Sequence, residues 1–343
     1  MVDLGIKKRQ GKPRNRIGLD IGSHSIKIVE IQESSGKETL TGCGLKKIHG
    51  LPKEKIADAI KALVEESKIT AKDVNISISG QSLIARFVSM PKMSPEELKG
   101  AIRFEAEKFI PFDINEYILD FQVLNKAEKD KATIDALLVA VKKEHVWQKI
   151  KLVEAAGLGV KLVDVDSLAA TNSFLKNFQA LDPVKTVAIL NMGASFTSLG
   201  ILKGSAIAFA RDVAIGGNDF NAAIAKKCNV ALEASEELKL MPKEKVADIA
   251  TCAKGVLANL LDEIKLSFSY HENQSGRSID EIYISGGAAG TVGLEEAFQE
   301  TLGSKPHYWN PFEFAETGSS GVDMSALEKS KSSFAVAVGL ALR

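Results

Sequence analysis

The chain has 343 residues, and its 44 Lys and Arg residues balance its 44 Asp and Glu residues, so its formal net charge is zero. Such a length suggests two domains, and a composition that is 45% hydrophobic and 26% charged excludes a largely disordered chain. The neutral balance lacks the basic excess of non-specific nucleic-acid binders, so no nucleic-acid partner is expected. Widely spaced cysteines and the lack of a long apolar run predict a cytoplasmic protein without a disulfide framework or membrane span.

The chain opens with a basic tail, which we place at residues 1–15. A solvated tail is the simpler interpretation of this short charge run, and contact with an anionic membrane surface is the alternative. Two β-branched segments then flank Gly22 and Ser23, which predicts a β-hairpin over residues 16–31. A strand near Leu40–Ile48 and an amphipathic helix over residues 53–66 follow.

A small α+β module is predicted over residues 82–157. Its clearest signal is the run Ser94-Pro-Glu-Glu97, a capping box with proline at the first helical position, and Pro111 is expected to end that helix. Strand patterns precede and follow this helix, and Gly157 ends a second helix. A buried strand at Val160–Val165 and a helix from Ser167 then continue the unit that the module interrupts.

A second predicted hairpin, over residues 186–204, repeats the first. Asn191 aligns with Asp20 and Gly193 with Gly22, so the offset is 191 − 20 = 171 residues, half of the chain. The repeat predicts two similar α/β domains built by duplication, with chance similarity as the alternative because the repeat is short.

The second half continues with further glycine turns. Gly216 and Gly217 are predicted to open a helix, and a short helix near Ala234–Leu240 and a long one from Lys243 to about Tyr270 follow. A strand from Ile282 then runs into the turn Gly286-Gly287 and a helix, a shape in which backbone N–H groups at a helix start face a ligand.

These glycine turns suit a polyphosphate, because backbone amides in a turn without bulky side chains approach an anion closely. Two facing turns would hold a nucleotide from both sides, although one glycine turn alone is more often structural. Ser23, Ser25 and Thr197 add hydroxyl donors, Lys27 adds positive charge, and Asp20 can hold Mg²⁺ through water. His24 either touches a phosphate or is an ordinary exposed turn residue.

The residues also carry a resemblance. Asp20-Ile-Gly-Ser-His-Ser-Ile-Lys27, Asn191-Met-Gly-Ala-Ser-Phe-Thr197 and Ile284-Ser-Gly-Gly-Ala-Ala289 resemble the phosphate 1, phosphate 2 and adenosine motifs of the actin/Hsp70/sugar-kinase superfamily. Arg86-Phe-Val-Ser-Met-Pro91 with the segment from Phe104 to Phe112 is similar to the type IV pilus assembly protein PilM family. The resemblance runs from about residue 16 to 343, and the module motif is its most specific part.

This resemblance implies an α/β, bilobal actin-like (ribonuclease H-like) fold of duplicated domains with a small inserted α+β subdomain. Residues 16–81 and 158–185 would form the first lobe (1A), closed by 330–343, residues 82–157 the inserted subdomain 1C, and residues 186–329 the second lobe. It also implies ATP with Mg²⁺ in the cleft between the lobes. The residues that would contact the nucleotide are Asp20, Gly22, Ser23, His24, Ser25, Lys27, Asn191, Gly193, Ala194, Ser195, Thr197, Gly216, Gly217, Glu236, Lys239, Gly286, Gly287 and Ala288, with Asp20 and Asn191 reaching the metal through water.

The family further implies a partner, the cytoplasmic N-terminal peptide of the inner-membrane protein PilN, in a groove between 1A and 1C. Phe109, Ile110 and Phe112 are candidates to line that groove, and ordinary packing explains them equally well. The expected location is cytoplasmic and peripheral at the inner membrane, within the pilus inner-membrane complex. Assembly into a homo-oligomer is a further alternative.

One departure concerns turnover. The superfamily usually has aspartate where this chain has Asn191, and an amide cannot act as a base at neutral pH. We therefore expect binding with weak or absent hydrolysis, with a neutral variant of a slow enzyme as the alternative. A sugar-type kinase would need an aspartate base. The resemblance implies that Asp164 and Asp166 belong to a structural connecting segment, so neither is a clear candidate for that base. A filament-forming adaptor like the cell-division protein FtsA is the other alternative.

Overall fold

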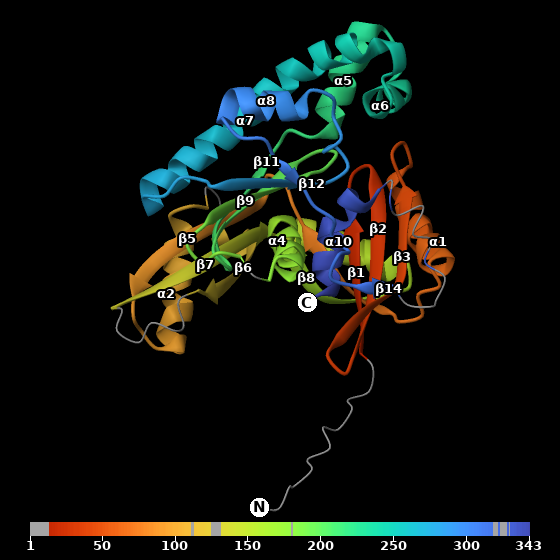
Figure 1. Ribbon diagram of the computed structural model, residues 1–343. Helices are drawn as coiled ribbons and strands as arrows, with labels where there is room; N and C mark the ends of the chain where they lie inside the picture. Colours follow the sequence, from red (N-terminus) through yellow and green to blue (C-terminus); the bar gives the residue numbers. More distant parts are fainter. Residues whose placement is uncertain are drawn as a thin grey trace, which may run out of the picture.

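The computed structural model describes residues 14–110, 113–124, 132–179, 181–317, 322, 328 and 330–343. Most of the basic tail, together with Pro111 and Phe112 of the module, therefore lies outside the described residues. The chain folds into two lobes around two central sheets, with a third, smaller sheet beside them (Figure 1).

The first central sheet has the order β14-β3-β2-β1-β4-β8. Its strands β1 (Arg14–Ile21), β2 (Ser25–Ser34) and β3 (Lys37–Lys47) form an antiparallel meander, and β4 (Asp73–Ile78) and β8 (Gly159–Val165) join in parallel. The edge strand β14 is Glu316–Thr317. The second sheet, with order β11-β10-β9-β12-β13, repeats the arrangement. Its strands are β9 (Thr186–Met192), β10 (Thr197–Lys203), β11 (Ala206–Val213), β12 (Glu281–Ser285) and β13 (His307–Tyr308).

The two sheets thus share one topology, three antiparallel strands followed by two parallel ones. This order confirms the duplication that the aligned hairpins predict. In each copy the hairpin strand that carries the aligned Asp20 or Asn191 lies at the centre of its sheet. The ends of these two central strands therefore occupy equivalent positions in the two lobes.

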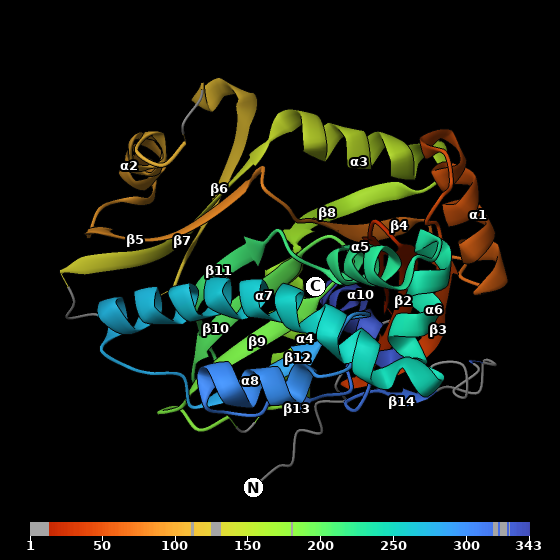
Figure 2. The same ribbon diagram turned by 90° about the horizontal axis from the view of Figure 1, so that it is seen from above.

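Helices cover both faces of each sheet. In the first lobe α1 (Ile56–Glu66) and α3 (Lys143–Ala155) share an apolar core with β1, β2 and β4. In the second, α5 (Gly217–Cys228), the long α7 (Val246–Ser275) and α8 (Leu294–Leu302) cover one face, with α6 (Leu232–Leu240) beside α5 (Figure 2). The sequence prediction placed most of these helices within a few residues of their observed ends.

Two helices form the layer between the lobes. The C-terminal helix α10 (Ala335–Ala341) packs against β1 and against α4 (Asp166–Asn177), the helix that leads from the first lobe to the second. The two helices cross so closely that a Cβ atom on Gly339 would lie 1.7 Å from the Ala169 carbonyl oxygen, so only glycine fits. Helix α10 is therefore part of the packing that joins the two lobes.

The inserted module is a three-stranded antiparallel sheet with the order β5-β7-β6 and one covering helix, α2 (Pro95–Glu107). Its strands are β5 (Leu83–Pro91), β6 (Tyr117–Val123) and β7 (Thr133–Lys142). The predicted capping box is present, with the Glu97 N–H donating to the Ser94 Oγ atom at 3.3 Å and the Ser94 N–H to Glu97 Oε2 at 2.9 Å. The helix ends at Glu107, earlier than the proline stop predicted.

Candidate functional site

A cavity of 520 Å³ lies between the lobes, at the ends of the central strands. This volume suits a small-molecule or cofactor ligand. Most of the residues predicted to contact a nucleotide line it, and the structure brings together Asp20, Gly22, Ser23, His24, Ser25, Lys27, Asn191, Gly193, Ala194, Ser195, Gly217, Glu236, Lys239, Gly286, Gly287 and Ala288.

The two hairpin turns face each other across this cavity. The Ser23 Oγ atom lies 2.7 Å from the Ser195 Oγ atom, which joins the turn of the first lobe to that of the second. Each turn closes in the same way, with Gly22 donating to the Ser25 carbonyl at 3.2 Å and Gly193 donating to the Phe196 carbonyl at 2.9 Å. The repeat in the sequence is therefore also a repeat in hydrogen bonding.

Several backbone donors of these turns are left over. Within the described part of the chain, the N–H groups of Ser23, His24, Ala194 and Ser195 donate to no protein acceptor. Four such groups around one cavity are the donors that a phosphate requires. The turns thus fit a polyphosphate by the chemistry of their backbone.

A charged pair lies at the foot of the first turn. Asp20 and Lys27 are opposite each other in the β1–β2 ladder, and their Oδ2 and Nζ atoms are 3.0 Å apart. Asp20 is buried apart from 6% of its surface, so an ion that replaced or joined Lys27 would find a carboxylate largely shielded from water. Among the described residues, no group of three or more His, Cys, Asp or Glu side chains could hold a metal by itself. A metal here would need further oxygens from a ligand or from water.

Asn191 occupies the matching place in the second lobe. Its Oδ1 atom accepts a hydrogen bond from Ser285 Oγ at 3.4 Å, between the neighbouring strands β9 and β12. The amide lines the cavity but brings no charge to it. The cavity thus has one carboxylate, Asp20, at its two duplicated strand ends.

The far wall comes from α5 and α6. Lys239 is only 2% exposed, and its Nζ atom lies 2.8 Å from Glu236 Oε2, which also accepts from Asn221 Nδ2 at 2.5 Å. Burial opposes the ionisation of Glu236, but the hydrogen bonds from Lys239 and Asn221 outweigh it and lower the pKa of Glu236. The wall therefore presents a fixed carboxylate with an adjacent buried ammonium group.

The third glycine turn differs from its prediction. Gly286 has a φ of +97°, and the turn is held by its N–H, which donates to the Ser332 carbonyl at 2.7 Å. Helix α8 begins only at Leu294, so the predicted helix start beside the glycines is wrong. Gly287 instead lines the cavity, where a Cβ atom would meet no other atom within 4 Å. Bare backbone and open space leave room here for a flat ligand group.

Two predicted contact residues do not line the cavity. Thr197 is fully buried, and its Oγ1 atom donates to the Ile215 carbonyl at 2.8 Å, which fixes the chain before α5. Gly216 donates its N–H to Asp219 Oδ2 at 2.8 Å and caps α5. Both residues therefore support the cavity wall and do not line it. The prediction assigned the Thr197 hydroxyl to the turn, but tertiary packing directs it into the core.

Sequence reasoning missed two charged residues that line the cavity. Asp166, set aside as part of a connecting segment, lines the cavity at the start of α4 together with Lys149 of α3. Near it, the Asp212 Oδ2 atom accepts from the Gly80 N–H at 2.8 Å, which joins β11 of one lobe to the chain after β4 of the other. Burial and the neighbouring Asp166 raise the pKa of Asp212 to about 6. The Asp164-Val-Asp166 run at a strand end was the available signal.

Asp164 itself is not in the cavity. It is buried and paired with the C-terminal Arg343, whose Nε atom lies 2.6 Å from Asp164 Oδ2. The segment before α10 also contributes lining serines that carried no recognisable motif: Ser330, Ser332 and Ser333.

The three residues predicted for a peptide groove have different surroundings. Phe109 is 39% exposed, with the Arg86 guanidinium 5.9 Å from its ring centre. Ile110 is 6% exposed and belongs to the module core with Ala106 and Ile114, so it cannot line an open groove. Phe112 lies outside the described residues.

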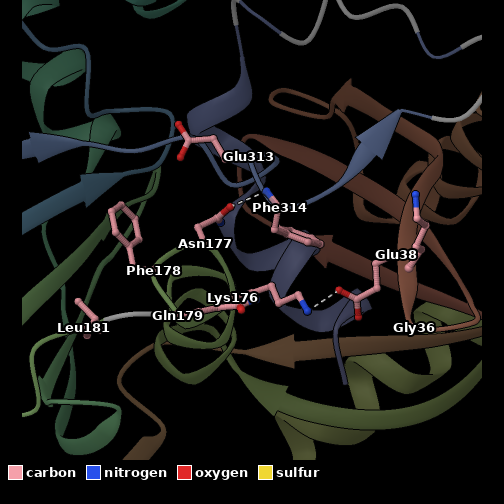
Figure 3. Close-up of a pocket in the computed structure, with 10 residues that line it drawn as sticks. Gly36, Glu38, Lys176, Asn177, Phe178, Gln179, Leu181, Glu313 and Phe314 are labelled. Carbon is pink, nitrogen blue, oxygen red and sulfur yellow. Dashed lines mark hydrogen bonds and ion pairs between the residues drawn. The ribbon is translucent and has the colours of Figure 1, made fainter.

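A second cavity, of 660 Å³, lies on another part of the molecule, between the β2–β3 turn, the end of α4 and residues 313–314 (Figure 3). Two hydrogen-bonded or ionic contacts join its lining residues. The Lys176 Nζ atom lies 2.8 Å from Glu38 Oε2, and the side chain of Asn177 accepts from the Phe314 N–H at 2.9 Å. Although it is larger, this cavity lacks the paired turns of the interlobe cavity, which is therefore the better candidate site.

Comparison with solved structures identifies the class. The chain superposes on a structure described as the PilM-PilN type IV pilus biogenesis complex with a TM-score of 0.85, at 28% identity and covering 96% of this chain and 98% of that one. The ethanolamine utilization protein EutJ from Carboxydothermus hydrogenoformans matches with a TM-score of 0.56, at 13% identity over 96% of this chain and 90% of that one. The fold is α/β, bilobal and actin-like, with a small inserted α+β subdomain.

The particular family follows from the sequence match. The family model "Type IV pilus assembly protein PilM" matches residues 18–343, and the chain belongs to that family. The cell division protein FtsA of Streptococcus pneumoniae serotype 2 (strain D39 / NCTC 7466) is 23% identical over 256 residues, which are 65% of this chain and 54% of that protein. The chain thus spans about half the length of this curated relative. Within the described residues, no helix is long and apolar enough to cross a membrane.

Proposed function

We propose that this protein binds ATP with Mg²⁺ in the interlobe cavity as a cytoplasmic component of the type IV pilus inner-membrane assembly platform. The observation that carries the proposal is the pair of facing turns, joined by Ser23 and Ser195 and retaining backbone donors without protein partners. Phosphates between the turns would take these donors from both lobes. Asp20 would hold the metal through water, and Asn191 would offer it an uncharged oxygen.

The remaining walls suit the nucleoside part of the ligand. Glu236 can accept hydrogen bonds from ribose hydroxyls, and the open surface at Gly287 has room for the base. A ligand that touches both lobes favours the arrangement in which both sets of contacts are made. Nucleotide binding would therefore select one relative position of the lobes.

Turnover is expected to be slow. Asn191 cannot take a proton from an attacking water at neutral pH, and Asp20 is engaged with Lys27. Two further carboxylates line the cavity, and Glu236 is paired with Lys239, so Asp166 is the candidate base for any hydrolysis. Its presence also supports a second candidate function, phosphoryl transfer to a small acceptor. ADP release that depends on an added sugar would favour that function.

We also propose that a PilN-type N-terminal peptide binds between the first-lobe sheet and the module. Strand β8 is an edge of the six-stranded sheet and β6 an edge of the module sheet, and α3 packs against the lobe and module sheets through β8 and β7. Leu162 and Val163 on β8 and Ile118 on β6 are each 37% exposed. An extended peptide can pair with an edge strand and place alternate side chains on such apolar groups. The protein would then be held peripherally at the inner membrane by its partner.

Two titrations test these proposals. Calorimetry on nucleotide-stripped protein should show Mg²⁺-dependent binding of ATP or ADP, and its absence would remove the nucleotide function.

The peptide proposal is tested by the second titration. A fluorescent PilN N-terminal peptide should bind saturably, and Leu162→Glu should weaken its affinity at least tenfold. Leu266→Glu on α7, where Leu266 is 61% exposed, is the matched control and should bind as the wild type does. Equal affinity of the two variants would place the peptide elsewhere. Sedimentation with ATP separates a monomer from an FtsA-like filament.

A further inference from the structure

His24 occupies a fixed place in the phosphate turn of the first lobe. Its carbonyl accepts from the Ile48 N–H at 2.8 Å and from the His49 N–H at 3.1 Å, which ties the turn to the end of β3. Its ring stacks on the ring of His49, with 5.4 Å between centres and 19° between planes. His24 also lines the cavity. The imidazole therefore has a stacked neighbour and borders the ligand space.

The charges around this ring come from both lobes. Glu236 and Lys239 of α6 act on it from the second lobe, and Lys47 of β3 and the stacked His49 from the first. Burial lowers the pKa of His24, and the three neighbouring bases lower it further while Glu236 partly opposes them. In the protein without ligand, the ring at neutral pH is consequently in its uncharged form.

We propose that His24 binds the nucleotide phosphates as an imidazolium, so that nucleotide binding takes up one proton from solution at this side chain. This inference rests on the proposed nucleotide function and adds to it a residue and a coupled proton. The proton passes from buffer acid to a ring nitrogen, and no covalent bond of the nucleotide changes. Both ring nitrogens then donate, one of them toward a phosphate oxygen.

The physical reason is the charge of the ligand. A polyphosphate held at this turn would bring negative charge into the cavity that His24 lines, which favours the charged form of the ring against the surrounding bases. The other cation of the turn, Lys27, is already paired with Asp20. His24 is the group of this turn whose charge can change near neutrality when the ligand arrives.

The sign of the pH dependence follows. Because the bound state holds the extra proton, affinity for a nucleotide falls as pH rises between the pKa of the free ring and that of the bound ring, by up to about tenfold per pH unit. The number of protons taken up is measured directly by calorimetry of Mg·ADP binding in two buffers of different ionisation enthalpy. We expect a fraction of a proton or more at pH 7.5 for the wild type.

Two histidine variants isolate the effect. His24→Gln should bind with no proton uptake beyond that of the ligand itself, whereas His307→Gln, at an exposed histidine of β13, should match the wild type. Because all three proteins share the ligand's own titration, the difference between them reports on His24. Equal uptake in His24→Gln and wild type would overturn the inference while leaving nucleotide binding intact. Absence of binding at every pH would instead overturn the nucleotide function, and the inference with it.

A direct measurement covers the case in which His24→Gln no longer binds. The Cε1–H resonance of His24 in the wild type can be titrated by NMR with and without saturating Mg·ADP. We expect its midpoint to move upward by one pH unit or more with the ligand. An unchanged or lowered midpoint would overturn the inference.

Discussion

The hydroxyls of Ser23 and Ser195 lie 2.7 Å apart, although 172 residues separate them in the chain. Each sits in a glycine turn at the end of a central strand, one in each lobe. Asn218 at the start of α5 also donates to Ser195 Oγ, at 3.2 Å, so this contact connects three elements around the cavity. A phosphate that enters between the turns must replace the Ser23–Ser195 hydrogen bond with bonds to its own oxygens.

Replacement of Ser23 by alanine should therefore weaken nucleotide binding. Loss of one hydroxyl donor to a charged phosphate costs about 1.5 kcal/mol or more, which corresponds to roughly tenfold in Kd. Calorimetry with Mg·ADP measures this loss. Ser89→Ala, at an exposed serine of the module strand β5, is the control and should leave the Kd unchanged. Equal Kd values for the two variants would mean that the turn does not contact phosphate.

A larger side chain at Gly287 tests whether the ligand lies against this open surface. In Gly287→Val the side chain would meet no protein atom at its Cβ position and would project into the cavity, so nucleotide affinity should fall at least tenfold while the Tm changes by no more than a few degrees. Gly290→Val provides a matched control. A Cβ atom at Gly290 also has no neighbour within 4 Å, but this glycine does not line the cavity. Unaffected binding in Gly287→Val would place the ligand elsewhere.

Asn191→Asp asks whether a restored carboxylate increases turnover. We expect a modest increase, at most about tenfold in phosphate release, because the attacking water must also be positioned. Adding Asp166→Asn to this variant should remove the gain if Asp166 supplies the base. A hundredfold increase from Asn191→Asp alone would show that the charge at this position is the missing element and would contradict our expectation.

The raised pKa of the buried Asp212 predicts a pH dependence of stability. The pKa of Asp212 is raised by burial and by Asp166 to about 6, from its ordinary 3.8. Between these two pKa values the folded state therefore holds a proton that the unfolded state has released, so this group contributes least to stability above pH 6 and most at acidic pH. A shift of this size corresponds to about 2–3 kcal/mol.

Asp212→Asn should accordingly be more stable than the wild type at pH 8, and this difference should shrink as pH falls from 6 to 4. The amide oxygen can still accept from the Gly80 N–H, so the interlobe contact is retained. Urea unfolding at pH 5 and pH 8 measures the effect, with Asp120→Asn at an exposed residue of β6 as the control. A stability difference that does not depend on pH would contradict the assignment.

Local patterns predicted much of the fold. Alternating β-branched residues around Gly22 and Gly193 predicted the two hairpins, because a strand needs only its own side-chain periodicity to be recognised. The run from Ser94 to Glu97 predicted the start of α2, because the capping hydrogen bonds join residues three positions apart. The offset of the repeat predicted the common topology of the two sheets.

The cavity itself depended on packing between distant parts of the chain. Thr197 turns into the core and Asp166 turns toward the ligand space, although the sequence alone favoured the opposite assignment. The alignment of the repeats pairs Ser23 with Ala194, yet the hydroxyl contact forms one residue further on, at Ser195. These placements depend on how the two lobes pack, and α4 and α10 cross closely between the lobes. Sequence periodicity therefore determined the two turns, and the long-range packing of the lobes decided which of their side chains meet.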